Sequence, residues 1–358
     1  MRRTALSIIA ALSAVALAGN VAAQPAPESN NPFRLDGSTL TLQIENDFFT
    51  GPTNNKDRHY SSGLRLNWLS PPIGGTPQWL RDFTDSSETA LGFLDSRQAG
   101  PVRRRLGISV GQSIYTPQDK DAVVPLPNDR PYAAWLYLGV SLQTIRYDGS
   151  KGAPDPIRQD IWELDVGMIG PAALGEQTQN GFHALIGSPK SRGWDHQLHN
   201  ELGVNLTYER RWRLGRLKLI DAPIKLRFDM VPTVGFSVGN VNTYAAAGGI
   251  FRLGENLGND FGPPRIRPSL PGSESIDPES GFGWYVFAGA NGEAVLRNIT
   301  LDGNRHSPNV DKKLFVGDLT AGLAIFIGGS RLSYTYVVRS KEFDGQKGVD
   351  QYGAITFT

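Results

Sequence analysis

The chain has 358 residues, with 36 Lys plus Arg against 35 Asp plus Glu, and it has no Cys. The even balance of charge excludes a protein built to attract nucleic acid. The absence of Cys excludes a disulfide framework and a thiolate metal site, so stability must come from a large core or a closed sheet.

The N-terminus is typical of a secretory signal peptide, which we predict over residues 1–23. Basic residues precede an apolar stretch, and small residues lead to a cleavage point near Ala23. A leader follows at residues 24–37, and residues 38–358 are expected to form one domain outside the cytoplasm. No other segment is apolar over the roughly 20 residues that a membrane-spanning helix needs.

Twelve segments with alternating apolar and polar residues then follow along the chain. In one of them Leu202, Val204 and Leu206 share a face, while Asn205 and Thr207 share the other. One face suits lipid and the other suits water. The segments lie near residues 38–47, 60–69, 105–114, 133–146, 158–169, 198–213, 216–230, 231–253, 282–296, 313–327, 331–341 and 350–357.

This pattern favours an all-β, antiparallel transmembrane β-barrel of about twelve strands. A secreted β-sandwich or β-propeller would also show many alternating strands. Residues 70–104 and 254–281 would be long connections for the periplasmic side, and the first is predicted to hold a small helix around Pro77–Phe83. Aromatic residues near segment ends fit the interfacial girdles of a barrel: Trp68, Trp135, Trp212, Trp284 and Tyr285.

The first segment ends in Asn46 and Asp47, which packing alone does not explain. Alternation places Asp47 on the polar face with Glu45 and Asn46 on the apolar face, so both reach one site only if the strand ends or bulges there. An Asx turn that opens the next loop is the simpler alternative. If both termini are periplasmic, these residues, Tyr60-Ser61 and the loop 170–197 all lie at the extracellular rim.

That loop is predicted to contain a short amphipathic helix over Thr178–Ile186, ended by Gly187. His183 then lies one turn from Gln179 and Asn180, which could fix its tautomer. An ordinary surface histidine is the alternative. A carboxylate, an amide and a hydroxyl on the same rim make a hydrolytic site a reasonable hypothesis.

The other histidines attract no functional prediction. His196 and His199 have H-x-x-H spacing but lack the H-E-x-x-H pattern of zinc proteases. His59 and His306 lie in polar loop sequence.

From about Leu40 to the C-terminus, the chain resembles the outer-membrane lipid A 3′-O-deacylases. The resemblance rests on several motifs in order, among them "IENDFF", "HYSSGL", "NDRPYAAWLYLG" and "IGPAALGEQTQNGFHALIG". It implies a twelve-stranded barrel, inserted by the outer-membrane assembly machinery, that removes 3′-linked acyl chains from lipid A of lipopolysaccharide in a calcium-dependent reaction. The implied functional positions are Asn46, Asp47, Ser61 and His183.

These residue types suggest a mechanism. His183 takes a proton from water, while a calcium ion held by Asp47 and Asn46 polarises the ester carbonyl. Ser61 is either a nucleophile or a donor that positions the ester. Glu176 is the candidate acid partner of His183, because Ser188, Pro189 and Lys190 stand where some relatives carry an acid.

Substrate binding is predicted for Tyr60, Arg130 and Lys190. Lipid A carries phosphates, and Arg130 directly precedes a predicted strand, where a rigid strand end can hold its guanidinium in place. Solvation or pairing with nearby acids such as Asp129 is the alternative. Two other functions remain open: a non-enzymatic barrel, either a narrow pore or a structural protein, and an outer-membrane phospholipase.

Overall fold

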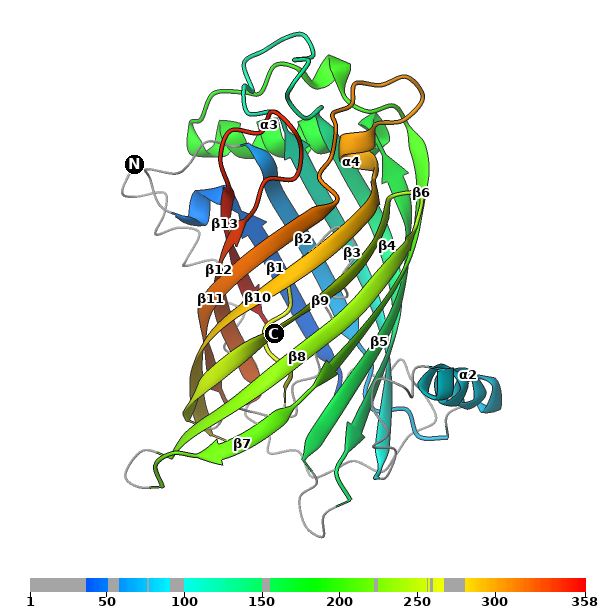
Figure 1. Ribbon diagram of the computed structural model, residues 1–358, viewed down its shortest axis with the longest axis vertical. Helices are drawn as coiled ribbons and strands as arrows, with labels where there is room; N and C mark the ends of the chain where they lie inside the picture. The colour runs from blue at the N-terminus through cyan, green and yellow to red at the C-terminus, as the bar shows by residue number, and fades with distance from the viewer. Residues whose placement is uncertain are drawn as a thin grey trace.

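The computed structural model describes residues 37–50, 58–75, 77–90, 100–149, 155–221, 225–255, 257, 260–266 and 281–358. The predicted signal peptide, and all of the predicted leader except Gly37, lie outside these residues. Figure 1 shows a tall β-barrel with helices near its two ends. We call these the α3 end and the α2 end, after the helix Gly175–Ile186 and the helix Gln78–Ala90.

The strands follow the predicted order along the chain. They are β1 (Thr39–Asn46), β2 (His59–Leu69), β3 (Val102–Thr116), β4 (Ala133–Tyr147), β5 (Pro156–Ile169), β6 (Glu201–Trp212), β7 (Leu214–Lys218), β8 (Leu226–Gly239), β9 (Asn242–Glu255), β10 (Phe282–Asn298), β11 (Phe315–Ile327), β12 (Ser330–Arg339) and β13 (Asp350–Phe357). The remaining helices are η1 (Asp47–Thr50), η3 (Pro171–Ala173), η4 (Trp194–His196) and α4 (Ile299–Asp302).

The sheet is closed. Antiparallel pairs run through all the strands, and β1 pairs with β13 while β6 pairs with β8. Since β7 continues β6 along the same strand β8, the wall has twelve strand positions, and the predicted twelve-stranded barrel is confirmed. Closure leaves no open sheet edge, which lipid could not satisfy with hydrogen bonds.

One predicted boundary is wrong. The sequence suggested separate strands over 216–230 and 231–253, but β8 runs unbroken through this point. Pro232 is tolerated in the middle of β8 because it lies beside Trp212, where β6 ends before β7 begins. The chain reverses instead at Asn240 and Val241.

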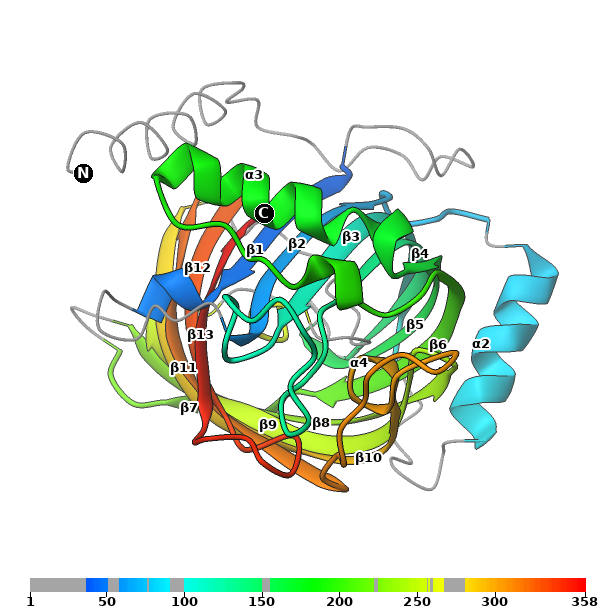
Figure 2. The same cartoon turned by 90° about the horizontal axis from the view of Figure 1, so that it is seen from above.

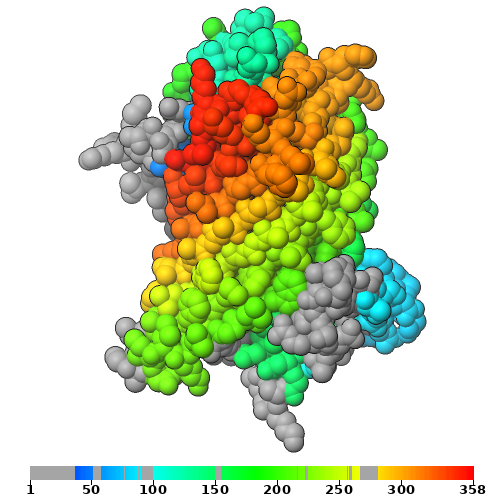
Figure 3. All heavy atoms as spheres, in the orientation of Figure 1, coloured from blue at the N-terminus to red at the C-terminus, as the bar shows by residue number. Residues whose placement is uncertain are grey.

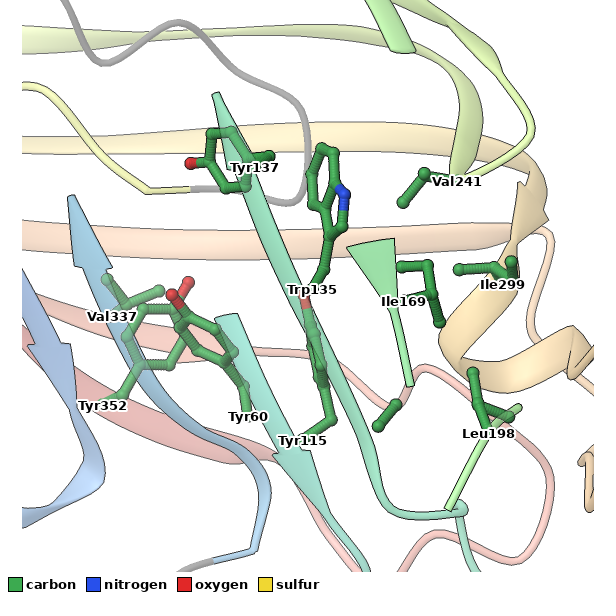
Figure 4. Packing of buried hydrophobic residues seen from close by; sticks show 11 residues of the cluster. Tyr60, Tyr115, Trp135, Tyr137, Ile169, Leu198, Val241, Ile299, Val337 and Tyr352 are labelled. Atoms are coloured by element: carbon green, nitrogen blue, oxygen red, sulfur yellow. The ribbon is translucent and has the colours of Figure 1, made fainter. Parts of the chain in front are cut away.

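The alternating faces of the strands are as predicted. On β6, Leu202 is 58% exposed on the outer wall, whereas Asn205 is fully buried on the inner face. The girdle interpretation is wrong for two aromatic residues that point inward. Trp135 stacks on Tyr137 with ring centres 4.3 Å apart in the buried cluster of Figure 4, and Tyr285 is fully buried.

Paired charges fill the interior of the barrel. Arg252 of β9 and Arg331 of β12 both donate to Asp260, the latter at 2.6 Å. Asp260 belongs to the β9–β10 connection. Because these interior arginines bind it, residues 260–266 lie inside the wall. At the end of this segment the Ile266 N–H donates to Glu45 of β1 at 2.7 Å.

The helix α2 lies outside the sheet. The helix predicted around Pro77–Phe83 is confirmed as α2, which packs Phe83 against Trp162 of β5 at 5.6 Å between ring centres. Arg104 also donates to Asp85 of α2 at 3.0 Å. In the described part of the chain, no helix is both long and apolar enough to cross a membrane.

We predict that Asp260→Asn weakens the barrel. The substitution leaves Arg252 and Arg331 with a weaker buried partner, and breaking such pairs costs about 3–5 kcal/mol. A folded barrel in detergent should run faster on a denaturing gel when unheated than when boiled. In the variant, we expect the fast band to disappear at a lower temperature.

Asp221→Asn is the matched control, because Asp221 pairs with Arg227 at 3.0 Å but its side chain is 74% exposed. An exposed pair contributes about 0–1 kcal/mol, so this variant should melt like the parent. Equal melting of the Asp260→Asn variant and the parent would show that residues 260–266 do not support the barrel.

Candidate active site

The end of β1 places Asn46 and Asp47 at the α3 end. The Asn46 side-chain oxygen accepts the Phe48 N–H at 2.8 Å, so the Asx turn considered from the sequence is present. Asp47 begins η1 and is only 3% exposed. The strand ends here, as a joint role for the two residues would require.

The start of β2 contains a β-bulge at Ser61. Tyr60 pairs with Tyr115 of β3 and Ser62 pairs with Ile114, so Ser61 is the extra residue. Tyr60 and Ser61 are both buried at this bulge. Ser61 Oγ lies 2.5 Å from Thr116 Oγ1, on the β3 side of the bulge.

Strand register brings these two groups together. Asn46 pairs with Ser62 across β1 and β2, so Asp47 and Ser61 are each one residue beyond that pair. The Tyr60 hydroxyl donates to Glu45 Oε2 at 2.9 Å, which ties the two strands together beside the site. Alternation already placed Glu45 on the inner face in the sequence, but only the register shows its partner.

His183 lies on α3 at the same end of the barrel. This helix ends at Gly187, as predicted, but begins at Gly175, one turn earlier than expected. Viewed from above, α3 runs along the rim beside the ends of β1, β2 and β3 (Figure 2). The helix packs closely on the wall, because a Cβ added to Gly175 would be 2.5 Å from Ala134 Cβ.

The tautomer of His183 is fixed by a backbone carbonyl. Its Nδ1 lies 2.6 Å from the Pro189 carbonyl oxygen, and a carbonyl only accepts, so Nδ1 carries the proton. When the ring is neutral, Nε2 is then its basic nitrogen. Glu176, the candidate acid partner of His183, is exposed on α3, and Nδ1 contacts Pro189.

Gln179 and Asn180, expected to orient His183, instead fasten α3 to the segment that follows it. Gln179 accepts from the Trp194 indole at 3.1 Å, and the Asn180 side-chain oxygen accepts the Ser191 N–H at 2.9 Å. These contacts hold the turn that carries Pro189 against the helix. No sequence signal distinguished Pro189 from other loop residues.

Arg130 supports the rim in this structure. Its guanidinium donates to Glu342 at 3.1 Å and to Thr300 at 2.7 Å, and it lies 4.5 Å above the Tyr115 ring. The side chain is fully buried, so phosphate binding would require this ion pair to open. Lys190 is exposed just beyond α3.

The arginines next to Glu342 change the pKa of its carboxylate. Burial would raise the pKa of Glu342, but Arg339 and Arg130 outweigh burial and hold the pKa below its usual range. Because the folded-state pKa is lowered, Glu342 stabilises the rim at neutral pH and loses that effect as the pH falls through the lowered value. Figure 3 shows the red β12–β13 loop, which carries Glu342, against the orange segment around α4.

The site offers oxygen ligands of the kind that calcium prefers. Asp47 supplies a buried carboxylate, and the Asn46 amide oxygen and the backbone carbonyls of η1 lie next to it in the chain. Within the described ranges, no three His, Cys, Asp or Glu side chains cluster as metal ligands. The residues therefore fit a cation held by one carboxylate with neutral oxygens and water.

Comparisons with known proteins agree with the fold. The solved structure of LpxR from Salmonella typhimurium has a TM-score of 0.66 and 20% identity, covering 89% of this chain and 98% of that one. The β domain of the Bordetella autotransporter BrkA has a TM-score of 0.40 at 12% identity, covering 90% of this chain and 98% of that one. No curated protein sequence matches the chain.

A model of the family described as outer membrane protein LpxR matches residues 6–358, nearly the whole chain. Together with the closed barrel, this match places the protein in the bacterial outer membrane. The chain belongs to the family of the outer membrane protein LpxR.

Proposed function

We propose that this outer-membrane, lipid A-modifying protein is an esterase that removes 3′-linked acyl chains from lipid A of lipopolysaccharide. The observation that carries the proposal is the bond from His183 Nδ1–H to the Pro189 carbonyl. It leaves Nε2 as a base at the same end of the barrel as the buried Asp47 and Ser61. The acyl position follows from the resemblance of the sequence motifs.

In the proposed reaction, His183 Nε2 takes a proton from a water molecule. The water oxygen bonds to the ester carbonyl carbon, and the bond from that carbon to the sugar oxygen then breaks. The proton on Nε2 passes to the departing sugar oxygen, so the products are a fatty acid and a free hydroxyl. The Pro189 carbonyl accepts the Nδ1–H throughout the cycle, so only Nε2 gains and loses a proton.

Ser61 is proposed to position the ester. Its hydroxyl shares a hydrogen bond with Thr116 Oγ1 at 2.5 Å, which favours a positioning donor over a nucleophile activated by His183. Calcium, when bound, would supply positive charge that polarises the ester carbonyl and stabilises the oxyanion. Asp47 would hold it, with Asn46 and backbone oxygens as further ligands.

The interior of the barrel does not favour a pore. Arg252 and Arg331 hold Asp260 inside the wall, and residues 260–266 continue from it to Glu45. A phospholipase would differ from the proposed esterase in its substrate. Purified protein should therefore be given lipid A and glycerophospholipids in parallel, and mass spectrometry should show deacylation of lipid A alone. Deacylation of glycerophospholipids alone would overturn the proposal.

We predict that His183→Ala reduces deacylation by about 10²-fold or more, because it removes the base that activates water. The released fatty acid is measured by mass spectrometry. His196→Ala is the matched control, since His196 lies in the same loop but is exposed, and it should retain activity. Full activity in the His183→Ala variant would remove this residue from the mechanism.

Two substitutions at Ser61 separate its two roles. Ser61→Ala should reduce turnover, whereas Ser61→Thr keeps a hydroxyl and should retain most activity if Ser61 positions the ester. Rapidly quenched parent protein should carry no acyl group on the peptide that contains Ser61. An acylated Ser61 peptide would instead identify a nucleophile.

Removal of calcium should have the same effect as a change at Asp47. We expect Asp47→Asn to weaken calcium binding, measured by calorimetry, and to reduce deacylation, because a charged carboxylate ligand is replaced by a neutral amide. Chelation should reduce the activity of the parent protein, and added calcium should restore it. Asp195→Asn, at an exposed acid of the same rim, is the control. Unchanged activity after chelation would argue against a calcium requirement.

A further inference from the structure

His59, the first residue of β2, has an unusual backbone conformation. Its φ is 62°, in the left-handed region. Side chains with a Cβ disfavour this region, and such conformations persist only where their surroundings hold them. Of the described residues, the other non-glycine cases of positive φ are Leu174, Arg305 and His306, and none of them lies in a strand.

The side chain of His59 is completely buried and makes specific contacts. Its Nδ1 lies 2.6 Å from Asp350 Oδ1 at the start of β13, and a carboxylate accepts, so Nδ1 donates. The ring meets the Phe343 ring edge-on at 5.2 Å. Asp350 is itself oriented by Gln346, whose amide donates to Oδ2 at 3.0 Å.

This contact is possible because β1 ends early. Asn46 pairs with Ser62 of β2 on one side and with Gly353 of β13 on the other. His59 and Asp350 each lie three residues beyond that level. Once β1 turns into η1, no strand separates β2 from β13, and the two side chains meet directly.

The neighbouring contacts show the same meeting of β2 and β13. The rings of Tyr60 and Tyr352 lie 5.0 Å apart, and both belong to the cluster in Figure 4. On the opposite face of β13, η1 packs tightly, because a Cβ added to Gly353 would be 2.6 Å from Phe49 Cβ. The helix that begins with Asp47 therefore rests directly on β13.

His59 also sets one end of the bulge that shapes the site. On the β3 side, His59 pairs with Thr116, and regular pairing resumes only at Ser62. The bulge thus lies between a fixed point at His59 and the regular ladder. Tyr60 and Ser61 keep their positions in the bulge only while those two ends are held.

We propose that His59 is a positioning residue for the candidate active site. Its left-handed backbone and its hydrogen bond to Asp350 hold the start of β2 against β13, which fixes the bulge that carries Ser61 beside Asp47. His59 acts through Ser61 and Asp47 and does not itself touch the ester. The proposal rests on the proposed esterase function for its kinetic test, but its structural test is independent.

Three substitutions separate the backbone from the side chain. Asn accepts left-handed φ and its amide can replace the Nδ1 donor, so His59→Asn should retain most activity. Gly accepts the backbone but makes no bond to Asp350, so His59→Gly should lower kcat by about 10- to 100-fold with little change in KM. His306→Gly is the matched control, since His306 also has positive φ but is exposed, and it should behave like the parent.

The chain has no Cys, so Ser61→Cys introduces a single thiol that reports on the site. Ser61 is 2% exposed, and its replacement thiol should react slowly with a maleimide. Adding His59→Gly should accelerate labelling about tenfold, by releasing the start of β2 to local opening, and adding His59→Asn should not. This measurement needs no substrate.

The outcomes are distinct. Faster labelling in the His59→Gly background, with no deacylation of lipid A by the parent, would reject the proposed function and keep the role of His59. Two results would overturn that role. The Gly variant could show the same labelling rate and the same kcat as the parent, or the Asn and Gly variants could lose the same amount of activity. If His59→Gly does not give the heat-modifiable barrel band, Asp350→Asn replaces it and must accelerate labelling for the proposal to stand.

Discussion

Closure of the sheet, by pairing of β6 with β8 and of β1 with β13, is the constraint on which the rest of the molecule depends. Lipid offers no partner to a backbone N–H or C=O, so every strand needs a neighbour on both sides. Each strand then has one face toward lipid and one toward the interior. The interior side chains are enclosed together, and their charges must pair with one another.

That enclosed interior also supports the candidate site. The segment 260–266 enters the barrel, where Asp260 is held by arginines from two strands, and it ends at Ile266 against Glu45. Glu45 in turn accepts the hydroxyl of Tyr60 at the start of β2. The position of the rim residues therefore depends on packing deep within the barrel as well as on the loops above them.

The early end of β1 organises the rim. Because β1 stops at Asn46, Asp47 can enter the helix η1 instead of pairing in the sheet. Beyond the end of β1, β2 and β13 contact each other directly. On the β3 side, β2 carries the bulge at Ser61. α3 then covers the rim from outside the sheet and brings His183, with its ring nitrogen fixed by Pro189.

The sequence by itself determined the alternating faces, the number of strand positions, the helix end at Gly187 and the family motifs, because each depends on residues close together in the chain. It also led to Asp47 and His183 as candidate site residues. Only the tertiary structure decided that Arg130 is buried against Glu342, 212 residues away, and that His59 bonds to Asp350, 291 residues away. These partners meet only when the barrel closes, and no local pattern records which distant side chains closure brings into contact.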